Sequence, residues 1–385
     1  MLTKNIFFKN FKRKKYTRNI RKHLKQLIVS NSEVIKSLTN NYDYSYTKQK
    51  IKKFKKFKDV RIFGMGGSSL GANAIYDFLR FKIKKNFNFL SNLNKRKFSS
   101  KKSYLNLIIS KSGNTLETIV NSNIYISKKD KNILVSENKL SDLRNLALKL
   151  KSEIIDHNNF IGGRYSVLSE VGMLPAELMG LSEKKFKQLN NLLKNKLFFN
   201  SIINNVANII ELVKKKKSNA VILNYDESLD NFLKWYQQLV AESIGKKGKG
   251  IFPIISTMPK DNHSLMQLYL DGQKNNFYTF FYSGDKLSPK INKEMITKSQ
   301  NFLINKSLQN VLDSQILATK RVFEKKNIPF RSFFLKSRKE ETLGELFAFF
   351  IIETILIAKS LKINPYDQPS VELIKKETSK ILISY

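Results

Sequence analysis

The sequence contains no cysteine among its 385 residues, which excludes disulfide bonds and thiolate chemistry. Histidine is almost as scarce, because the chain has only His23, His157 and His263. No two of these histidines have the spacing of metal ligands. We therefore expect no metal site.

Acidic residues are few relative to basic ones, since 31 Asp and Glu stand against 70 Lys and Arg and the formal net charge is +39. Such a charge can indicate a nucleic-acid or anionic-surface partner. The lysines are spread along the whole chain beside abundant Asn and Ile, which favours a compositional bias over a dedicated nucleic-acid site. An anionic substrate would still gain from the positive field.

A membrane-spanning segment is also lacking. The longest apolar stretch, residues 343–362, contains Glu345 and Glu353, and a carboxylate is costly at the centre of a bilayer. We expect a buried helix there. The basic amino-terminal segment has no continuous apolar core of the kind found in secretory signals. These features predict a soluble, cytoplasmic protein.

The chain is longer than one hydrophobic core usually supports, which favours two domains. Short apolar runs alternate with helical patterns in both halves, and this alternation predicts parallel sheets with helices on both faces. Residues 1–58 are expected to be helical and basic. The expected strands are residues 60–63, 104–109, 132–136, 153–156, 219–223, 251–255, 277–282 and 330–335.

A glycine-rich turn follows the first expected strand and contains Gly64, Gly66 and Gly67. Glycine lets the backbone approach a ligand closely, and the free N–H groups of the following helix can bind an anion. The turn has neither the lysine of a P-loop nor the spacing of a dinucleotide-binding motif. Alone, it predicts a ligand contact without identifying the ligand.

The segment SKSGNTLET follows the second expected strand and opens a helix. It brings the hydroxyls of Ser110, Ser112 and Thr115 together with the positive charge of Lys111. Hydroxyls and unpaired N–H groups at a helix start suit a phosphate. Helix capping also favours Ser and Thr, but three hydroxyls and Gly113 within six residues exceed what a cap requires.

Residues 225–245 have a helical pattern in which Gln238 and Glu242, four residues apart, share one face away from an apolar stripe. A polar helix face is usually solvated, so this pair becomes a candidate site only together with other motifs. Arg164 directly follows two glycines. It could cap a helix, pair with a surface carboxylate or project into a cleft, and its spacing leaves these alternatives open.

Three other polar residues have no distinctive pattern of their own. His263 is expected near a helix start, where histidine commonly makes local hydrogen bonds. A final amphipathic helix should begin near Gln368, because Pro369 suits a first helical turn. Lys375 lies seven residues after Gln368 on the same face, and alone it is typical of a solvated lysine.

Four segments in this order resemble the signature segments of the glucose-6-phosphate isomerase family: SKSGNTLET, GGRYSVLSEVGMLPAELMG, QQLVAESIGKKGKG and YDQPSVELIKK. The resemblance extends from about residue 58 to the C-terminus. It implies an α/β fold of two sugar-isomerase-type domains, each with three α/β/α layers and a mainly parallel sheet, plus extra helices. The chain should begin with a basic helical region of residues 1–57. The first domain is then expected to cover residues 58–198, and the second residues 199–385, including C-terminal helices.

The resemblance implies reversible interconversion of glucose 6-phosphate and fructose 6-phosphate through a cis-enediol intermediate. It implies no metal, nucleotide or redox cofactor. It further implies a homodimer in which each subunit contributes a histidine to the active site of its neighbour.

The implied roles fall on individual residues of this sequence. Glu242 is the expected catalytic base, Arg164 faces the enediolate, and His263 and Lys375 form the pair associated with ring opening. The expected substrate contacts are Gly67, Ser68, Ser110, Lys111, Ser112, Thr115, Gln238 and Gln368.

Two other functions share these motifs. An isomerase that also accepts mannose 6-phosphate would need the same phosphate loop and base, and the sequence does not set the preference between epimers. A sugar-phosphate-sensing regulator would need the phosphate loop but no base. The simultaneous presence of Glu242, Arg164, His263 and Lys375 favours the enzyme. Neither a specific nucleic-acid partner nor a membrane is expected.

Overall fold

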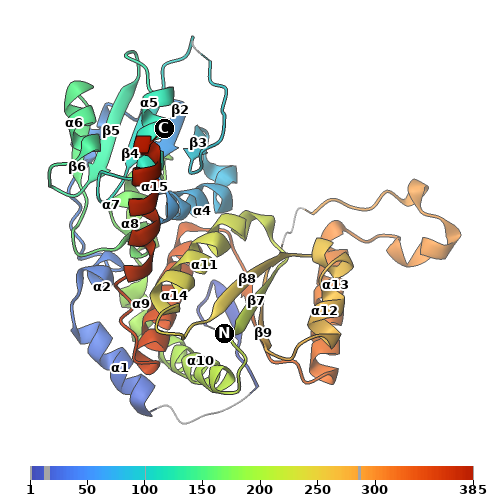
Figure 1. The fold of residues 1–385 in the computed structure, drawn as a ribbon. Helices are drawn as coiled ribbons and strands as arrows, with labels where there is room; N and C mark the ends of the chain where they lie inside the picture. The colour runs from blue at the N-terminus through green and yellow to red at the C-terminus, as the bar shows by residue number, and fades with distance from the viewer. Residues whose placement is uncertain (1, 13–17, 100, 285–287, 385) are drawn as a thin grey trace.

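The computed structural model describes residues 2–12, 18–99, 101–284 and 288–384, and within these ranges the chain forms two five-stranded sheets with helices packed against them (Figure 1). All neighbouring strands of the first sheet are parallel, so their carboxyl ends share one edge. In spatial order this sheet consists of β3 (Asn86–Leu90), β2 (Asp59–Phe63), β4 (Leu105–Ile109), β5 (Lys131–Ser136) and β6 (Glu153–Asp156).

The second sheet is parallel except at one edge, where β1 runs antiparallel to β10. In spatial order it consists of β1 (Ile6–Lys9), β10 (Phe330–Leu335), β9 (Asn276–Ser283), β7 (Asn219–Asn224) and β8 (Phe252–Thr257). Two mainly parallel sheets with helices confirm the expected α/β fold class. The proposed division of the chain at residues 58 and 199 stays a prediction.

In the central strands, alternate residues face different cores, as the two-residue period of a strand requires. In β7, Ile222 faces an inner core that also contains Ile62 of β2, whereas Val221 and Leu223 face an outer core. Helices that also contribute buried residues to the inner core are α4 (Leu70–Phe78), α7 (Glu170–Leu178), α10 (Lys196–Lys214), α11 (Asp230–Ile244) and α14 (Glu340–Ser360). One continuous core therefore joins the two sheets.

Further helices cover the outer faces. On the first sheet these are α5 (Leu116–Tyr125) and α6 (Asp142–Lys149), and on the second α12 (Met266–Asp271) and α13 (Leu308–Lys325). The remaining α-helices are α1 (Arg18–Val29), α2 (Glu33–Ser37), α3 (Lys48–Lys52), α8 (Glu183–Phe186), α9 (Leu189–Lys194) and α15 (Glu372–Ser384).

Short 3-10 helices complete the chain. They are η1 (Gly66–Ser68), η2 (Arg80–Lys82), η3 (Gly163–Leu168), η4 (Glu227–Leu229), η5 (Lys260–His263), η6 (Lys293–Met295), η7 (Lys298–Leu303) and η8 (Pro369–Val371).

All eight expected strands are confirmed to within two residues, but the structure has two more. The helical expectation for residues 1–58 is wrong at β1, where Ile6 and Phe8 are buried against the sheet while Phe7 and Lys9 are exposed. The strand β3 was not expected, because its alternating Asn and Phe residues form no continuous apolar run.

The apolar stretch near the C-terminus is the buried helix α14, as expected. Both carboxylates of this apolar stretch have partners: Glu345 accepts hydrogen bonds from Thr3 and Asn5, and Glu353 pairs with Arg331. These partners offset the cost of burying a charged group in the core. Across the described ranges, none of the helices has the length and apolar character needed to cross a bilayer.

Candidate active site

The glycine turn after β2 is the place where three segments meet. A Cβ atom on Gly67 would lie 2.2 Å from the carbonyl carbon of Gly163 and 2.7 Å from the backbone nitrogen of Arg164. A Cβ atom on Gly66, whose φ is +50°, would lie 2.6 Å from Nε2 of Gln238. Glycine is thus required for close approach to both η3 and α11.

Arg164 lies on η3 and is almost fully buried, at 2% exposure. Its Nε donates to Oγ of Ser243 at 2.9 Å, and its Nη1 donates to Oε2 of Glu242 at 3.2 Å and to Oε1 of Gln368 at 2.9 Å. Its Nη2 donates to the backbone oxygens of Pro365 and Asp367 at 2.6 and 3.1 Å. These hydrogen bonds hold the guanidinium group in one orientation. Of the three alternatives that the sequence left open for Arg164, a helix cap and a surface ion pair are therefore both wrong.

Glu242 and Gln238 lie on one face of α11, as the helical period predicted. Nε2 of Gln238 donates to Oε1 of Glu242 at 2.8 Å, while Oε2 of Glu242 accepts from Arg164. Each carboxylate oxygen thus has a fixed donor. The Glu242 side chain is still 32% exposed, so a reactant can reach it.

Sequence reasoning missed the residues that support this arrangement. The hydroxyl of Tyr165 lies 2.7 Å from Oγ of Ser243 and donates to the backbone oxygen of Pro365 at 3.0 Å. Nε1 of Trp235 donates to the backbone oxygen of Arg164 at 3.2 Å. Burial raises the pKa of Tyr165, so its proton stays available for donation. Tyr165 directly follows Arg164 and Ser243 directly follows Glu242. This adjacency is the one sequence feature that could have indicated them.

The segment that brings Gln368 into the site is fastened to the end of α11. Nζ of Lys246 donates to the backbone oxygens of Asn364 and Asp367 at 2.6 and 2.5 Å, and it pairs with the Asp367 carboxylate at 2.5 Å. The hydrogen bond from Lys246 lowers the pKa of Asp367. This segment supplies Arg164 with its two backbone acceptors.

The expected phosphate loop begins at the carboxyl end of β4. Ser110 is buried, and its Oγ lies 2.8 Å from Oγ1 of Thr115 and accepts from the backbone N–H of Gly113. Gly113 has φ of +70° and lies against Ser141, so it needs glycine. Thr115 is the N-cap residue of α5, but its side chain makes no capping hydrogen bond. Capping therefore does not account for this hydroxyl.

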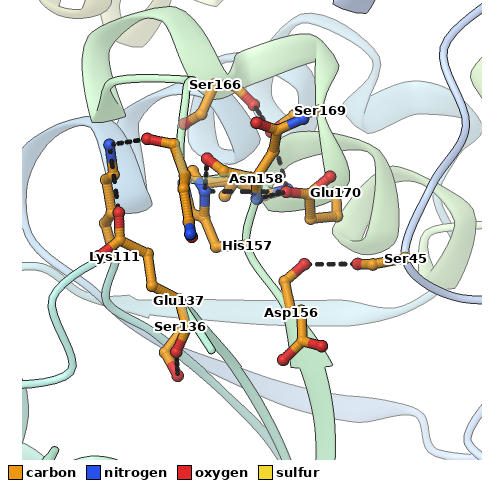
Figure 2. Close-up of polar contacts among 12 residues, drawn as sticks. Ser45, Lys111, Ser136, Glu137, Asp156, His157, Asn158, Ser166, Ser169 and Glu170 are labelled. Atoms are coloured by element: carbon orange, nitrogen blue, oxygen red, sulfur yellow. Dashed lines mark hydrogen bonds and ion pairs between the residues drawn. The ribbon is translucent and has the colours of Figure 1, made fainter. Parts of the chain in front are cut away.

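Lys111 points along the rim of this loop. Its Nζ donates to the backbone oxygen of Asn159 at 2.9 Å and lies 3.4 Å from the carboxylate of Glu137 (Figure 2). Burial raises the pKa of Glu137, but hydrogen bonding to Lys139 and the charges of both lysines outweigh it, so the pKa is lowered. Ser112 is exposed at the tip of the loop, where its Oγ accepts from the backbone N–H of Asn114.

The expected ring-opening pair lies on other elements. His263 is exposed at the end of η5, and no hydrogen bond or ion pair between described residues joins it to Glu242 or Arg164. Lys375 is exposed on α15. Ser68 lies on η1, next to Gly67. The structure therefore brings together Arg164, Gln238, Glu242 and Gln368, and their roles stay predictions.

Comparisons with known proteins agree with the family resemblance. A family model described as phosphoglucose isomerase matches residues 28–384. A glucose-6-phosphate isomerase of Methanocaldococcus jannaschii is 34% identical over 359 residues, covering 86% of each chain. Another, from Mycoplasmopsis synoviae, is 30% identical over 368 residues, covering 88% of this chain and 86% of that protein.

A solved glucose-6-phosphate isomerase from Chlamydia trachomatis has a TM-score of 0.70 at 18% identity, covering 95% of this chain and 83% of that one, which shows a shared fold. Because the family model spans most of the sequence and curated relatives reach 34% identity, the chain belongs to the phosphoglucose isomerase family.

Proposed function

We propose that the site around Glu242 and Arg164 carries out the interconversion of glucose 6-phosphate and fructose 6-phosphate, with Glu242 as the base. Membership of the family makes the chain an aldose–ketose isomerase that acts on these sugar phosphates. The observation that carries the residue assignment is the carboxylate of Glu242, which Gln238 and Arg164 hold by its two oxygens while it stays open to solvent.

Glu242 would remove the proton from C2 of the open-chain aldose, and the electron pair released would form the C1–C2 double bond of a cis-enediol. The protonated carboxyl group would then return the proton to C1, which gives the ketose and restores the carboxylate. One group can serve both carbons when it is fixed between them. Its hydrogen bonds to Gln238 and Arg164 support such a fixed position.

Arg164 would stabilise the negative charge that develops on the enediolate oxygen. A guanidinium group suits this task because it stays protonated and because its hydrogen bonds hold it in place before the reaction begins. Such prior orientation avoids a reorganisation cost in the transition state.

The loop from Ser110 to Thr115 would bind the phosphate group, far from the reacting carbons. Its hydroxyls and the helix start of α5 are suitable phosphate ligands, and Lys111 at the rim supplies the positive charge. Binding energy from this remote group would orient C1 and C2 against Glu242.

The active enzyme would be a homodimer with shared sites. The family resemblance assigns ring opening to His263 and Lys375, and it places the histidine in the site of the neighbouring subunit. The exposure of His263, and its lack of a hydrogen bond or ion pair to Glu242 or Arg164 among the described residues, are compatible with such an exchange.

A coupled spectrophotometric assay of fructose 6-phosphate conversion, run in EDTA, tests the assignment of the base. Glu242→Gln should lower kcat by about two to four orders of magnitude while KM changes little, because it removes only the proton-transfer group. The matched control is Glu227→Gln, which removes one carboxylate charge from the exposed η4 turn before the same helix. Near-normal turnover of Glu242→Gln would show that the base lies elsewhere.

A further inference from the structure

Arg164 lies midway along a loop whose two ends are joined by one buried carboxylate. Glu170, the first residue of α7, is 1% exposed, and its Oε1 accepts a hydrogen bond from the backbone N–H of Asn158 at 2.7 Å (Figure 2). This hydrogen bond joins the two ends of residues 158–170. The side chain of Arg164 leaves from its middle.

The second carboxylate oxygen of Glu170 holds the loop against the amino-terminal region. Its Oε2 accepts from the hydroxyl of Tyr42 at 2.8 Å. Nearby, Nδ2 of Asn158 donates to the carboxylate of Glu33 at 2.9 Å. Nδ1 of the adjacent His157 lies 3.8 Å from Oε1 of Glu170, and burial lowers the pKa of this ring, which weakens it as a countercharge. Each carboxylate oxygen of Glu170 therefore accepts one hydrogen bond, Oε1 from Asn158 and Oε2 from Tyr42.

The same loop contacts the phosphate loop. The backbone oxygen of Asn159, one residue beyond the contact with Glu170, accepts the hydrogen bond from Nζ of Lys111. At Gly163 the loop packs directly on the glycine turn at Gly67. A displacement at the base of the loop would thus reach both Lys111 and Arg164.

We propose that Glu170 is a positioning residue for the isomerase reaction, which holds the 158–170 loop so that Arg164 faces Glu242 and Lys111 stays at the rim of the phosphate loop. The inference rests on the proposed function, because Arg164 must act on the enediolate for its position to matter. A shift of about 1 Å in a charged group of this kind can cost about 100-fold in rate.

Two substitutions separate the hydrogen bond from the volume of the side chain. Glu170→Gln keeps an amide oxygen that can accept from Asn158, and the hydroxyl of Tyr42 can rotate to accept from the amide nitrogen. Glu170→Leu keeps a similar volume but removes both acceptors. Glu345→Leu is the matched control, because Glu345 is also a buried carboxylate with two donors, Thr3 and Asn5, and lies outside this loop.

The experiment measures kcat and KM for fructose 6-phosphate, together with Tm, for the full-length enzyme and these variants. Glu170→Leu should lower kcat by about 10- to 100-fold with KM changed less than about threefold, whereas Glu170→Gln should stay within about threefold of the wild type. Glu345→Leu should lower Tm by about as much as Glu170→Leu does, but it should leave kcat unchanged. Equal kcat losses in the two leucine variants would overturn the proposal, because they would indicate general destabilisation.

A second readout uses a phosphorylated sugar acid, whose planar carboxylate imitates the enediolate. Its inhibition constant should rise in Glu170→Leu by about the same factor as kcat/KM falls, as expected when transition-state binding is lost. If Glu170→Leu does not fold, Tyr42→Phe removes only one hydrogen bond to Glu170 and should lower kcat by about three- to tenfold. Wild-type kcat in whichever of these variants folds would refute the inference.

Arg164→Ala distinguishes this inference from the proposed function. An inactive Arg164→Ala beside a fully active Glu170→Leu would refute only the positioning role. An active Arg164→Ala would instead refute the assignment of Arg164, on which the positioning role depends.

Discussion

The contact between Gly67 and η3 allows a test with a single added methyl group. In Gly67→Ala the new Cβ would lie 2.2 Å from the carbonyl carbon of Gly163, whereas ordinary van der Waals contacts begin near 3.4 Å. The gap must widen by the difference, about 1.2 Å. Both partners at this contact are backbone, so no flexible side chain can move away. The turn and Arg164 must therefore separate.

The expected result is a loss of activity larger than the loss of stability. A separation of this size moves Arg164 relative to Glu242 and should lower kcat/KM by about 100-fold. Overpacking of this kind typically costs about 1–3 kcal/mol of folding free energy. The assay is the coupled isomerase reaction at a temperature where urea denaturation shows the variant to be folded.

Gly162→Ala is the matched control. Gly162 has a φ of −68° and a ψ of 152°, which alanine adopts readily, and the nearest atom to a new Cβ is 3.8 Å away on Tyr165. This variant should keep its activity and gain about 0.4–1 kcal/mol of stability. If Gly67→Ala retained wild-type kcat/KM, the close packing of the glycine turn on η3 would have no role in catalysis.

Two predictions concern buried charges. Burial lowers the pKa of Lys187 to about 7, so between pH 7 and the ordinary lysine value of 10.5 the unfolded chain holds a proton that the folded chain has lost. Stability from this group should therefore rise with pH across that window, by up to about 1.4 kcal/mol per pH unit. Urea denaturation of Lys187→Met from pH 7 to 9.5 should show a flatter pH dependence than the wild type, and an unchanged slope would contradict the lowered pKa. In the second half of the chain, Glu353→Gln leaves Arg331 buried beside α14 without its countercharge. It should cost about 3–5 kcal/mol in urea denaturation, and the double variant Arg331→Met, Glu353→Leu should recover most of this loss; if it did not, packing rather than charge would explain the effect.

Eight of the strands and the helix that contains Gln238 and Glu242 could be predicted, because they follow from local periodicity in the sequence. Apolar runs such as residues 105–109 are buried on both faces of a parallel sheet, and a spacing of four residues places Gln238 beside Glu242 on any helix. The strand β1 was missed because its partner, β10, lies more than 300 residues away in the sequence. An alternation of only four residues in a basic segment gives a weak signal until that partner is known.

The roles proposed for Arg164 and Glu170 could not be predicted from spacing, for a related reason. Four of the five acceptors of Arg164 come from residues 243, 365, 367 and 368, and the fifth is Glu242. No local pattern around residue 164 records any of them. Glu170 likewise follows a helix cap, Ser169, where an acidic residue is commonplace, so its contact with Asn158 has no sequence signature.

The contacts that orient the proposed catalytic residues also join the two halves of the chain. Arg164 follows the last strand of the first sheet, whereas Glu242 and Ser243 lie on the helix that connects two strands of the second. Trp235 of that helix also donates to the backbone of Arg164. Any movement that separated the sheets would break the hydrogen bonds that orient the guanidinium group. It follows that substitutions which loosen the inner core between the sheets should lower kcat before they unfold the chain, whereas those in the outer cores should lower stability alone.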